Sequence, residues 1–354
     1  MENRKNNKIH KYFAAANTYS GFKSFFDEIF RPEDYERIFI IKGGPGTGKS
    51  SFMKRISEEF FKSYYEIEHI HCSSDPASLD GIIISKNNKK IALLDGTAPH
   101  ERDAKIPGAF DEIINLAEGL DIRILSAQKD EILSLQKEKA KAYKIAYFYL
   151  GAAGKSEEII SETYKENFDI FGAKSKAEAI LSDVLTSNCS CISTRLVSSF
   201  GRQGSVYLDT LSTHPKRTIL VGGNDITASM FLACCFDILK AKKVPIIHLP
   251  FALDPSRTDA LFLPESNLAI IRGEGGEINA ADFVKIPPLD EERIKTARFL
   301  HSSCLEEARR WFSIASDIHF RLEKIYGNAM NFEKNDKIFD EKINQIADIF
   351  EKEI

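Results

Sequence analysis

The feature that most constrains this chain is a glycine-rich turn between an apolar run and an amphipathic segment. The run Ile38–Ile41 is β-branched and aromatic, which is typical of a buried strand. The turn follows as Gly43-x-x-x-x-Gly48-Lys49-Ser50. Beyond it, apolar residues recur at helical spacing with Lys and Glu between them, namely Phe52, Met53, Ile56, Phe60 and Phe61. The pattern predicts a strand, a tight turn and a helix in that order.

A turn of this kind is the phosphate-binding P-loop pattern. Glycine cheaply adopts the backbone angles that point successive N–H groups inward, and the following helix adds free N–H donors and the positive end of its dipole. We expect Lys49 to neutralise the β- and γ-phosphates of a nucleoside triphosphate, and the Ser50 hydroxyl to bind Mg²⁺. The predicted nucleotide-binding residues are Gly43, Gly44, Pro45, Gly46, Thr47, Gly48, Lys49, Ser50 and Ser51.

A second apolar run, Ile91–Leu94, predicts a strand that ends in Asp95-Gly96-Thr97. Ligands of open α/β sheets gather at the carboxyl ends of the strands. We therefore predict that Asp95 binds Mg²⁺ together with Ser50, in the position of a Walker B aspartate. The alternative is an aspartate that only starts a turn before glycine. No Glu follows Asp95, where many ATP-hydrolysing enzymes place the residue that activates water, so the general base is unassigned.

Two further acids, Asp75 and Asp80, follow the predicted strand Glu66–Cys72. Either carboxylate could take a proton from water, or from the hydroxyl of an acceptor substrate. Both recur later in the chain as Asp254 and Asp259, which favours a structural role such as helix capping. The predicted catalytic set consists of Lys49, Asp95 and Asp75.

The chain contains a second, altered copy of this region. Residues 37–85 lie over residues 216–264 without a gap, and several features recur: Gly43-Gly44 on Gly222-Gly223, His69 on His248, and Asp75-Pro76 on Asp254-Pro255. Further along, residues 91–96 lie over residues 268–273. This similarity predicts an internal duplication.

The two copies differ at the residues that are expected to bind the nucleotide and Mg²⁺. In this alignment Lys49 becomes Ala228, Gly46 becomes Asp225 and Asp95 becomes Arg272. A carboxylate in the anion-binding turn would repel a triphosphate at close range. We therefore expect the second copy not to bind ATP and Mg²⁺ in the usual way. It would be either a structural partner or a site for another ligand.

These observations predict an α/β protein with a P-loop NTPase-type parallel sheet flanked by helices, internally duplicated, with helical segments after each copy. The predicted domains are residues 1–185, an active P-loop NTPase domain with a helical segment at about 109–180, and residues 186–354, a degenerate second P-loop-like domain with helices at about 290–354. The helical segments would form a lid or cap over the turn. Their apolar stripes suit core packing or a subunit contact, which leaves a homo-oligomer open.

Composition excludes several classes of protein. The formal net charge of −4 disfavours nucleic-acid binding over the whole surface. No apolar stretch approaches the roughly 18–20 residues that a membrane span requires. Residues 1–8 lack the apolar core of a signal peptide, and the cysteines form no paired C-x-x-C pattern. We expect a cytoplasmic protein without membrane contact.

With these residues in view, the chain resembles a family of bacterial P-loop ATPase-like, nucleotide-binding proteins. The matching stretches are Phe13–Thr18 with Gly21-Phe22, Lys42–Ser51, His71–Asp75 with Ser78–Gly81, and Asp95-Gly-Thr-Ala-Pro-His100. The resemblance implies two tandem copies over nearly the whole chain, ATP binding and ATP hydrolysis. It supplies no substrate or protein partner. In that family the second copy often keeps a Gly-Lys-Ser turn, which is missing here.

Three functions fit the sequence. The first is an ATPase with ATP and Mg²⁺ as ligands, in which water attacks and turnover drives movement or binding of a partner. The second is a small-molecule or nucleotide kinase, in which Asp75 would deprotonate the acceptor hydroxyl. The third is a nucleotide sensor without catalysis. An arginine that stabilises the transition state would come from Arg102, Arg202 or Arg272.

Overall fold

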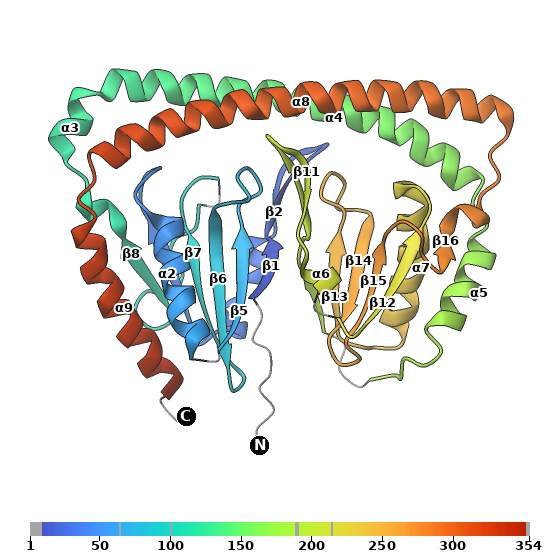
Figure 1. The fold of residues 1–354 in the computed structure, drawn as a ribbon, viewed down its shortest axis with the longest axis horizontal. Coiled ribbons are helices and arrows are strands. Elements are labelled where there is room, and N and C mark those ends of the chain that lie inside the picture. The colour runs from blue at the N-terminus through green and yellow to red at the C-terminus, as the bar shows by residue number, and fades with distance from the viewer. Residues whose placement is uncertain (1–8, 64, 100, 188–190, 214, 352–354) are drawn as a thin grey trace. The chain divides into compact units, whose positions relative to one another are not determined.

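The computed structural model describes residues 9–63, 65–99, 101–187, 191–213 and 215–351 (Figure 1). By its contacts the chain divides into two compact units, each assembled from separate segments. Unit 1 consists of the described residues of Met1–Ala14, Phe26–Lys144 and Trp311–Ile354. Unit 2 consists of Ala15–Phe25 and Ile145–Arg310.

Unit 1 contains a six-stranded sheet in the order β1-β5-β6-β7-β4-β8. Its strands are β1 (Ile9–Phe13), β4 (Arg37–Lys42), β5 (Glu66–His71), β6 (Leu79–Lys86), β7 (Lys89–Asp95) and β8 (Asp111–Asn115). The central strand β4 buries four consecutive apolar residues, Ile38 to Ile41, because helices or loops cover both faces of the sheet. Phe39 and Ile41 pack on the side of helix α2 (Lys49–Lys62).

The sheet is mixed, so the prediction of a parallel sheet is wrong at one strand. β1–β5, β4–β7 and β4–β8 are parallel pairs, whereas β6 runs antiparallel to both β5 and β7. The reason is local, because Asn87 and Asn88 both have positive φ, 51° and 64°. Such a two-residue turn joins neighbouring antiparallel strands. The apolar run before these asparagines forms β6.

Unit 2 contains a second six-stranded sheet with the equivalent order, β9-β13-β14-β15-β12-β16. Its strands are β9 (Ile192–Thr194), β12 (Arg217–Gly222), β13 (Ile246–Pro250), β14 (Thr258–Leu263), β15 (Leu268–Arg272) and β16 (Ile278–Asn279). Two hairpins also belong to this unit, formed by β2 (Ala15–Thr18) with β3 (Gly21–Ser24), and by β10 (Ser198–Gly201) with β11 (Gly204–Tyr207).

Strand pairing confirms that the chain contains two similar halves. Ile41 of β4 pairs with Asp95, and Val221 of β12 pairs with Arg272, so Arg272 occupies the place of Asp95. The same registers put Arg37 opposite Ile91 and Arg217 opposite Leu268. Strand β12 therefore matches β4 one residue further along than in the gapless alignment.

The helices of unit 1 are α1 (Phe26–Ile29), α2, α3 (Ile122–Ala127) and α9 (Glu333–Glu351), with short 3₁₀ turns η1 (Pro32–Asp34) and η2 (Leu116–Gly119). Those of unit 2 are α5 (Ile170–Ile180), α6 (Thr210–Thr213) and α7 (Asp225–Ala241), with η3 (Ala280–Phe283). Two long helices, α4 (Lys129–Glu166) and α8 (Pro288–Asn328), contribute residues to both units.

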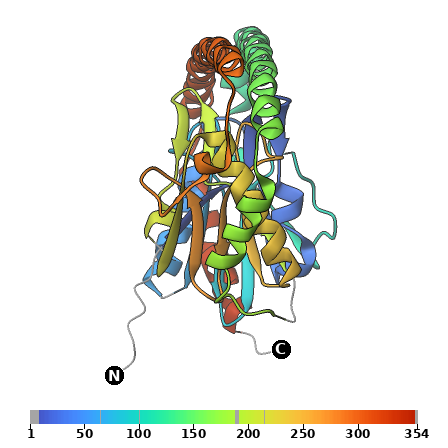
Figure 2. The ribbon, with the colours of Figure 1, turned by 90° about the vertical axis from the view of Figure 1, so that its right-hand side faces the viewer.

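The two halves exchange their terminal helices. Helix α9 follows the second copy in sequence but packs on α2 and η2 in unit 1. Helix α5 follows the first copy but packs on α7 and η3 in unit 2 (Figure 2). Each compact unit thus combines residues from both sides of the predicted boundary at 185/186. Helix α4 has 38 residues and is therefore about 57 Å long, which exceeds the diameter of a small domain. Because of this length, it carries the chain out of its own copy.

Candidate functional site

The glycine-rich turn lies at the carboxyl edge of the sheet in unit 1. Residues Gly43–Gly48 connect the end of β4 with the first residue of α2, and β7 ends beside them at Asp95. Gly46 and Gly48 have φ of 69° and 88°, a left-handed conformation that side-chain-bearing residues rarely adopt. The first N–H groups of α2 have no partner within the helix and point toward this turn. The predicted strand, turn and helix are all present.

Two of the predicted site residues, Lys49 and Asp95, lie together in the structure. The Nζ atom of Lys49 donates to the carbonyl oxygens of Gly43 at 3.2 Å and Gly44 at 2.9 Å. It also lies 3.6 Å from Oδ2 of Asp95, and the lysine side chain is 12% exposed. The amine is thus held by neutral carbonyls and one carboxylate. A phosphate oxygen is a stronger acceptor for an ammonium group than a carbonyl, so it can displace them.

The carboxyl group of Asp95 starts a turn, and its role as a Mg²⁺ ligand stays a prediction. Its Oδ1 accepts from the N–H of Thr97 at 2.9 Å and from the Thr97 hydroxyl at 2.6 Å, which starts a turn. Its Oδ2 faces Lys49. Burial raises the pKa of Asp95, and the Lys49 charge and the Thr97 hydrogen bonds oppose this effect. One carboxylate oxygen therefore remains directed at the turn.

The oxygen groups at this edge suit a Mg²⁺ ion that arrives with a nucleotide. The Ser50 Oγ accepts from the N–H of Leu79 at 2.9 Å, which leaves a lone pair for a cation. With one oxygen of Asp95 it offers hard ligands, and phosphate oxygens would complete the shell. Among the residues that the structure describes, no cluster of three or more His, Cys, Asp or Glu could hold a metal by itself.

The outer side of the turn is packed by helices that the sequence analysis did not connect with it. A Cβ atom on Gly44 would lie 2.8 Å from the ring of Tyr326, and one on Gly46 would lie 2.3 Å from the carbonyl oxygen of Glu323. The Nδ2 atom of Asn335 donates to the carbonyl of Thr47 at 2.9 Å. Helix α8 and the start of α9 therefore hold the turn, and bulk is excluded at its glycines.

Asp75 has the contacts of a turn residue. Its carboxylate accepts from the Ser78 hydroxyl at 2.8 Å and from the N–H of Ala77 at 3.4 Å. Asp254 in the second copy binds the N–H and hydroxyl of Ser256 in a similar way. Catalysis by Asp75 stays a prediction, and these bonds supply a structural reason for the residue in both copies.

The second copy has no loop at the corresponding place. Only Gly223 and Asn224 separate β12 from α7, and the Asn224 side chain caps the helix by accepting from the N–H groups of Ile226 at 3.0 Å and Thr227 at 3.1 Å. Helix α7 thus begins where the first copy still has its glycine turn. The N–H groups that would face a phosphate are bound by the chain's own side chain.

The charges of the second site neutralise one another. Arg272, in the place of Asp95, donates to Asp259 at 2.9 Å and to the Tyr207 hydroxyl at 2.6 Å, and forms an ion pair with Asp225. Arg272 thus neutralises both carboxylates, and Ala228, which aligns with Lys49, is a buried residue of α7. The expectation that Asp225 would lie in an open turn is corrected, because this residue is the first of α7.

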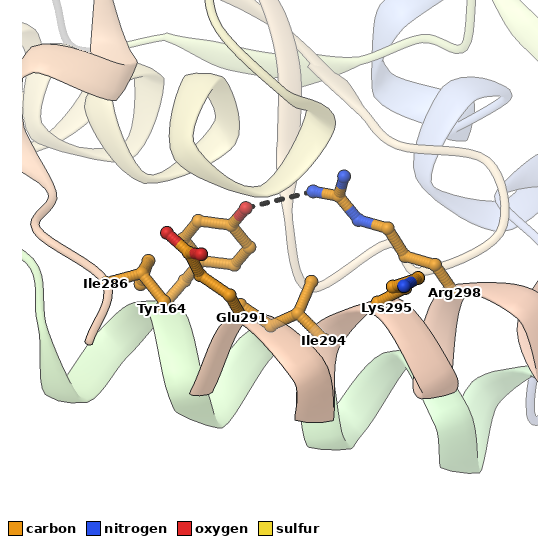
Figure 3. A pocket seen from close by; sticks show the side chains of 6 residues that line it. All are labelled: Tyr164, Ile286, Glu291, Ile294, Lys295 and Arg298. Carbon is orange, nitrogen blue, oxygen red and sulfur yellow. Dashed lines mark hydrogen bonds between the residues drawn. The ribbon is translucent and has the colours of Figure 1, made fainter. Parts of the chain in front are cut away.

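Two other features lie apart from the glycine turn. A pocket of about 350 Å³ in unit 2 is lined by Tyr164, Ile286, Glu291, Ile294, Lys295 and Arg298 (Figure 3). Within it Arg298 donates to the Tyr164 hydroxyl at 2.9 Å. Of the predicted arginine candidates, Arg102 is buried and donates to the Phe30 carbonyl, while Arg202 and Arg272 belong to unit 2.

Comparison with known proteins adds nothing to the site. No protein-family model, curated protein or solved structure matches the chain. Among the described residues, none of the helices combines the length and apolar character needed to span a bilayer. Function is therefore argued from the geometry of the site itself.

Proposed function

We propose that the protein binds ATP together with Mg²⁺ at Gly43–Ser51 of unit 1 and hydrolyses it. The observation that carries this proposal is the convergence of three groups at one sheet edge: a turn with two left-handed glycines, the amine of Lys49, and the carboxylate of Asp95. The second copy, which has the same strand order, supports the proposal by contrast. There the turn is shortened and the charges are inverted.

Each residue has a defined part in this proposal. The N–H groups of Gly46–Ser50 hold the β- and γ-phosphates, and the amine of Lys49 turns from the carbonyls of Gly43 and Gly44 toward them. The Ser50 hydroxyl and Asp95 would hold Mg²⁺, which neutralises charge on the phosphates when bound. The degenerate copy acts as a structural or regulatory partner.

The first test is Lys49→Ala, measured as ATP affinity by titration calorimetry in the presence of Mg²⁺. Loss of a charge-assisted contact worth about 1.5–3 kcal/mol should raise the Kd for ATP by about tenfold or more. The control is Lys62→Ala at the far end of α2, where the lysine is exposed and paired with Glu59. Equal ATP affinity in the wild type and in Lys49→Ala would contradict the role of the lysine.

The same calorimetry tests the degenerate copy through its stoichiometry. We expect one ATP per chain, and we expect Ala228→Lys to leave this number unchanged. The reason is that Asn224 still caps α7 and Arg272 still neutralises Asp225. Two ATP molecules per wild-type chain would contradict the proposed inactivity of the second copy.

Turnover distinguishes the proposed ATPase from the other two functions. Phosphate release in water without an added acceptor supports hydrolysis. ADP formation that requires an acceptor would indicate a kinase, for which Asp75 would have to leave its bonds with Ser78 and Ala77. Tight binding of ATP with no ADP formed would indicate a sensor.

A further inference from the structure

The proposed hydrolysis lacks a residue that activates water, and the usual position is closed. A Cβ atom on Gly96, directly after Asp95, would lie 2.3 Å from Cγ2 of Ile40 and 3.1 Å from the carbonyl oxygen of Arg102. No glutamate side chain fits there. Asp75 is bonded within its own turn. The other acid predicted from the sequence, Asp80, is buried within β6, so an accessible carboxylate has to come from another element of unit 1.

Helix α8 brings one carboxylate to the glycine turn. The backbone of Glu323 contacts the tip of the turn, since its carbonyl oxygen lies 2.3 Å from where a Cβ atom of Gly46 would be. Its side chain is 39% exposed, and its Oε1 lies 3.6 Å from Nε2 of His319, one helical turn earlier. The backbone contact fixes the position of Glu323 along the turn, while its side chain remains accessible to solvent.

The charges around Glu323 come from three elements of unit 1. Lys49 of the turn and Lys139 of α4 attract its carboxylate, and Asp75 repels it. Burial is the largest effect and raises the pKa of Glu323. Burial, followed by Lys139 and Lys49, lowers the pKa of His319 to about 4, so this imidazole is neutral at pH 7. The carboxylate of Glu323 thus has raised basicity and interacts with the charge of Lys49.

The second copy provides an internal comparison for this residue. After α4, the N–H of Asp169 donates to the carbonyl of Phe283 at the end of η3. After α8, the N–H of Asn331 donates equivalently to Gly119 at the end of η2. Counting back from these bonds aligns Tyr164 with Tyr326, and Ser161 with Glu323.

At this aligned position the carboxylate is present in the copy that has the lysine and absent from the copy that lost it, where α4 carries Glu157 one turn earlier, paired with Arg257. Tyrosine is kept three residues later in both helices, so the helices themselves are equivalent. A residue needed only for packing would be expected in both copies. A residue needed for turnover would be retained only beside Lys49.

We infer that Glu323 is the catalytic base of the ATPase reaction, a step that rests on the function proposed above. Its carboxylate takes a proton from water as the water oxygen forms a bond with the γ-phosphorus. The bond between that phosphorus and the oxygen bridging to the β-phosphate breaks, and its electron pair leaves with ADP. Glu323 then releases the proton to solvent, so that ATP and water give ADP, phosphate and a proton.

The test uses the full chain with Glu323→Gln, which keeps the backbone contact with Gly46. We expect kcat for ATP hydrolysis to fall by about 100-fold or more, the range for loss of a general base. The Kd for ATP should stay within about threefold, which corresponds to about 0.65 kcal/mol of binding. Glu323→Asp, which retains a carboxylate, should keep part of the activity. The control is Asp317→Asn on an exposed turn of α8.

A pH profile separates a base from a packing residue. The base must be ionised to accept a proton, and the pKa of Glu323 is raised. As the pH is lowered, wild-type kcat should therefore begin to fall at a higher pH than it would with a glutamate of ordinary pKa. In Glu323→Gln this decrease of kcat at acidic pH should be absent. Wild-type kcat in Glu323→Gln, with an unchanged melting temperature, would overturn the inference.

The outcomes also separate this inference from the proposed function. ATP binding without hydrolysis in the wild type would overturn the base and the ATPase activity, but not the nucleotide site. Failure of the wild type to bind ATP would overturn both. Binding and hydrolysis that are both indifferent to Glu323→Gln would leave the proposed function intact and overturn only the base.

Discussion

At the scale of single residues, the glycines of the turn satisfy two independent constraints. Gly46 has φ of 69°, and its missing side chain leaves room for the Glu323 carbonyl. The first constraint concerns the backbone of the turn, and the second its contact with α8. A substitution at Gly46 therefore reports on both, and a second glycine is needed to separate them.

Gly46→Ala should lower the free energy of unfolding by roughly 2–5 kcal/mol, from about 1–2 for the left-handed backbone and about 1–3 for the clash. Gly108→Ala is the matched control, because Gly108 has φ of 75° and nothing within 4 Å of its Cβ position. Urea unfolding of both variants measures the difference. If Gly46→Ala costs no more than Gly108→Ala, the contact between the turn and α8 is absent in solution.

At the scale of elements, the start of α9 is joined to the glycine turn. The side chain of Asn335 is buried, and its Nδ2 donates to the carbonyl of Thr47. Its Oδ1 is also buried and has no hydrogen-bond donor among the described residues. Further along α9, Lys342 forms an ion pair with Glu112 of β8 at 2.6 Å. These contacts fasten α9 to both the turn and the sheet.

Asn335→Ala should lower the free energy of unfolding by about 1 kcal/mol, since it removes one hydrogen bond from a buried carbonyl. It should also weaken ATP binding modestly, because Thr47 loses its support. Asn344→Ala is the control, since Asn344 is exposed on α9 and bonds only to its own helix at Asp340. Thermal unfolding and calorimetry measure the two effects. Identical behaviour of both variants would argue against a link between α9 and the turn.

At the scale of the whole molecule, neither half of the sequence contains all of its own unit. Helix α9 supplies the fully buried Ile346 to the core of unit 1, together with the partly buried Ile338, Phe339, Ile343 and Phe350. Each fully buried side chain of this size contributes about 1.5–3 kcal/mol. Ile346 reaches this value and the four partly buried side chains add less, so α9 supplies a substantial share of the stability of a domain, about 5–15 kcal/mol in total.

We therefore expect the fragment 1–185 to fail to fold or bind ATP when expressed alone. Mixing it with the fragment 186–354 should restore a cooperative melting transition and ATP binding, because α8 and α9 then return to unit 1. The control is the full chain cleaved at a protease site placed after residue 185. A fragment 1–185 that melts cooperatively and binds ATP by itself would refute the exchange of helices.

Local patterns in the sequence determined the strand Ile38–Ile41, the glycine turn, the convergence of Lys49 with Asp95, and the duplication with one altered copy. Such features depend on backbone angles and on spacing within short segments, which residue types specify directly. The antiparallel course of β6 also has a local signal, the two asparagines Asn87 and Asn88 at the turn before β7.

The tertiary structure alone decided which helix lies on which turn. An apolar stripe shows that a helix face is buried, but not against what, so nothing in the sequence joined Glu323 or Asn335 to residues 43–48. The exchange of α5 and α9 arises in the same way, because long helices carry the chain from one core to the other and packing selects the partner. The proposed base, Glu323, was identified from the tertiary structure alone, because contacts between distant segments leave no periodic pattern along the chain.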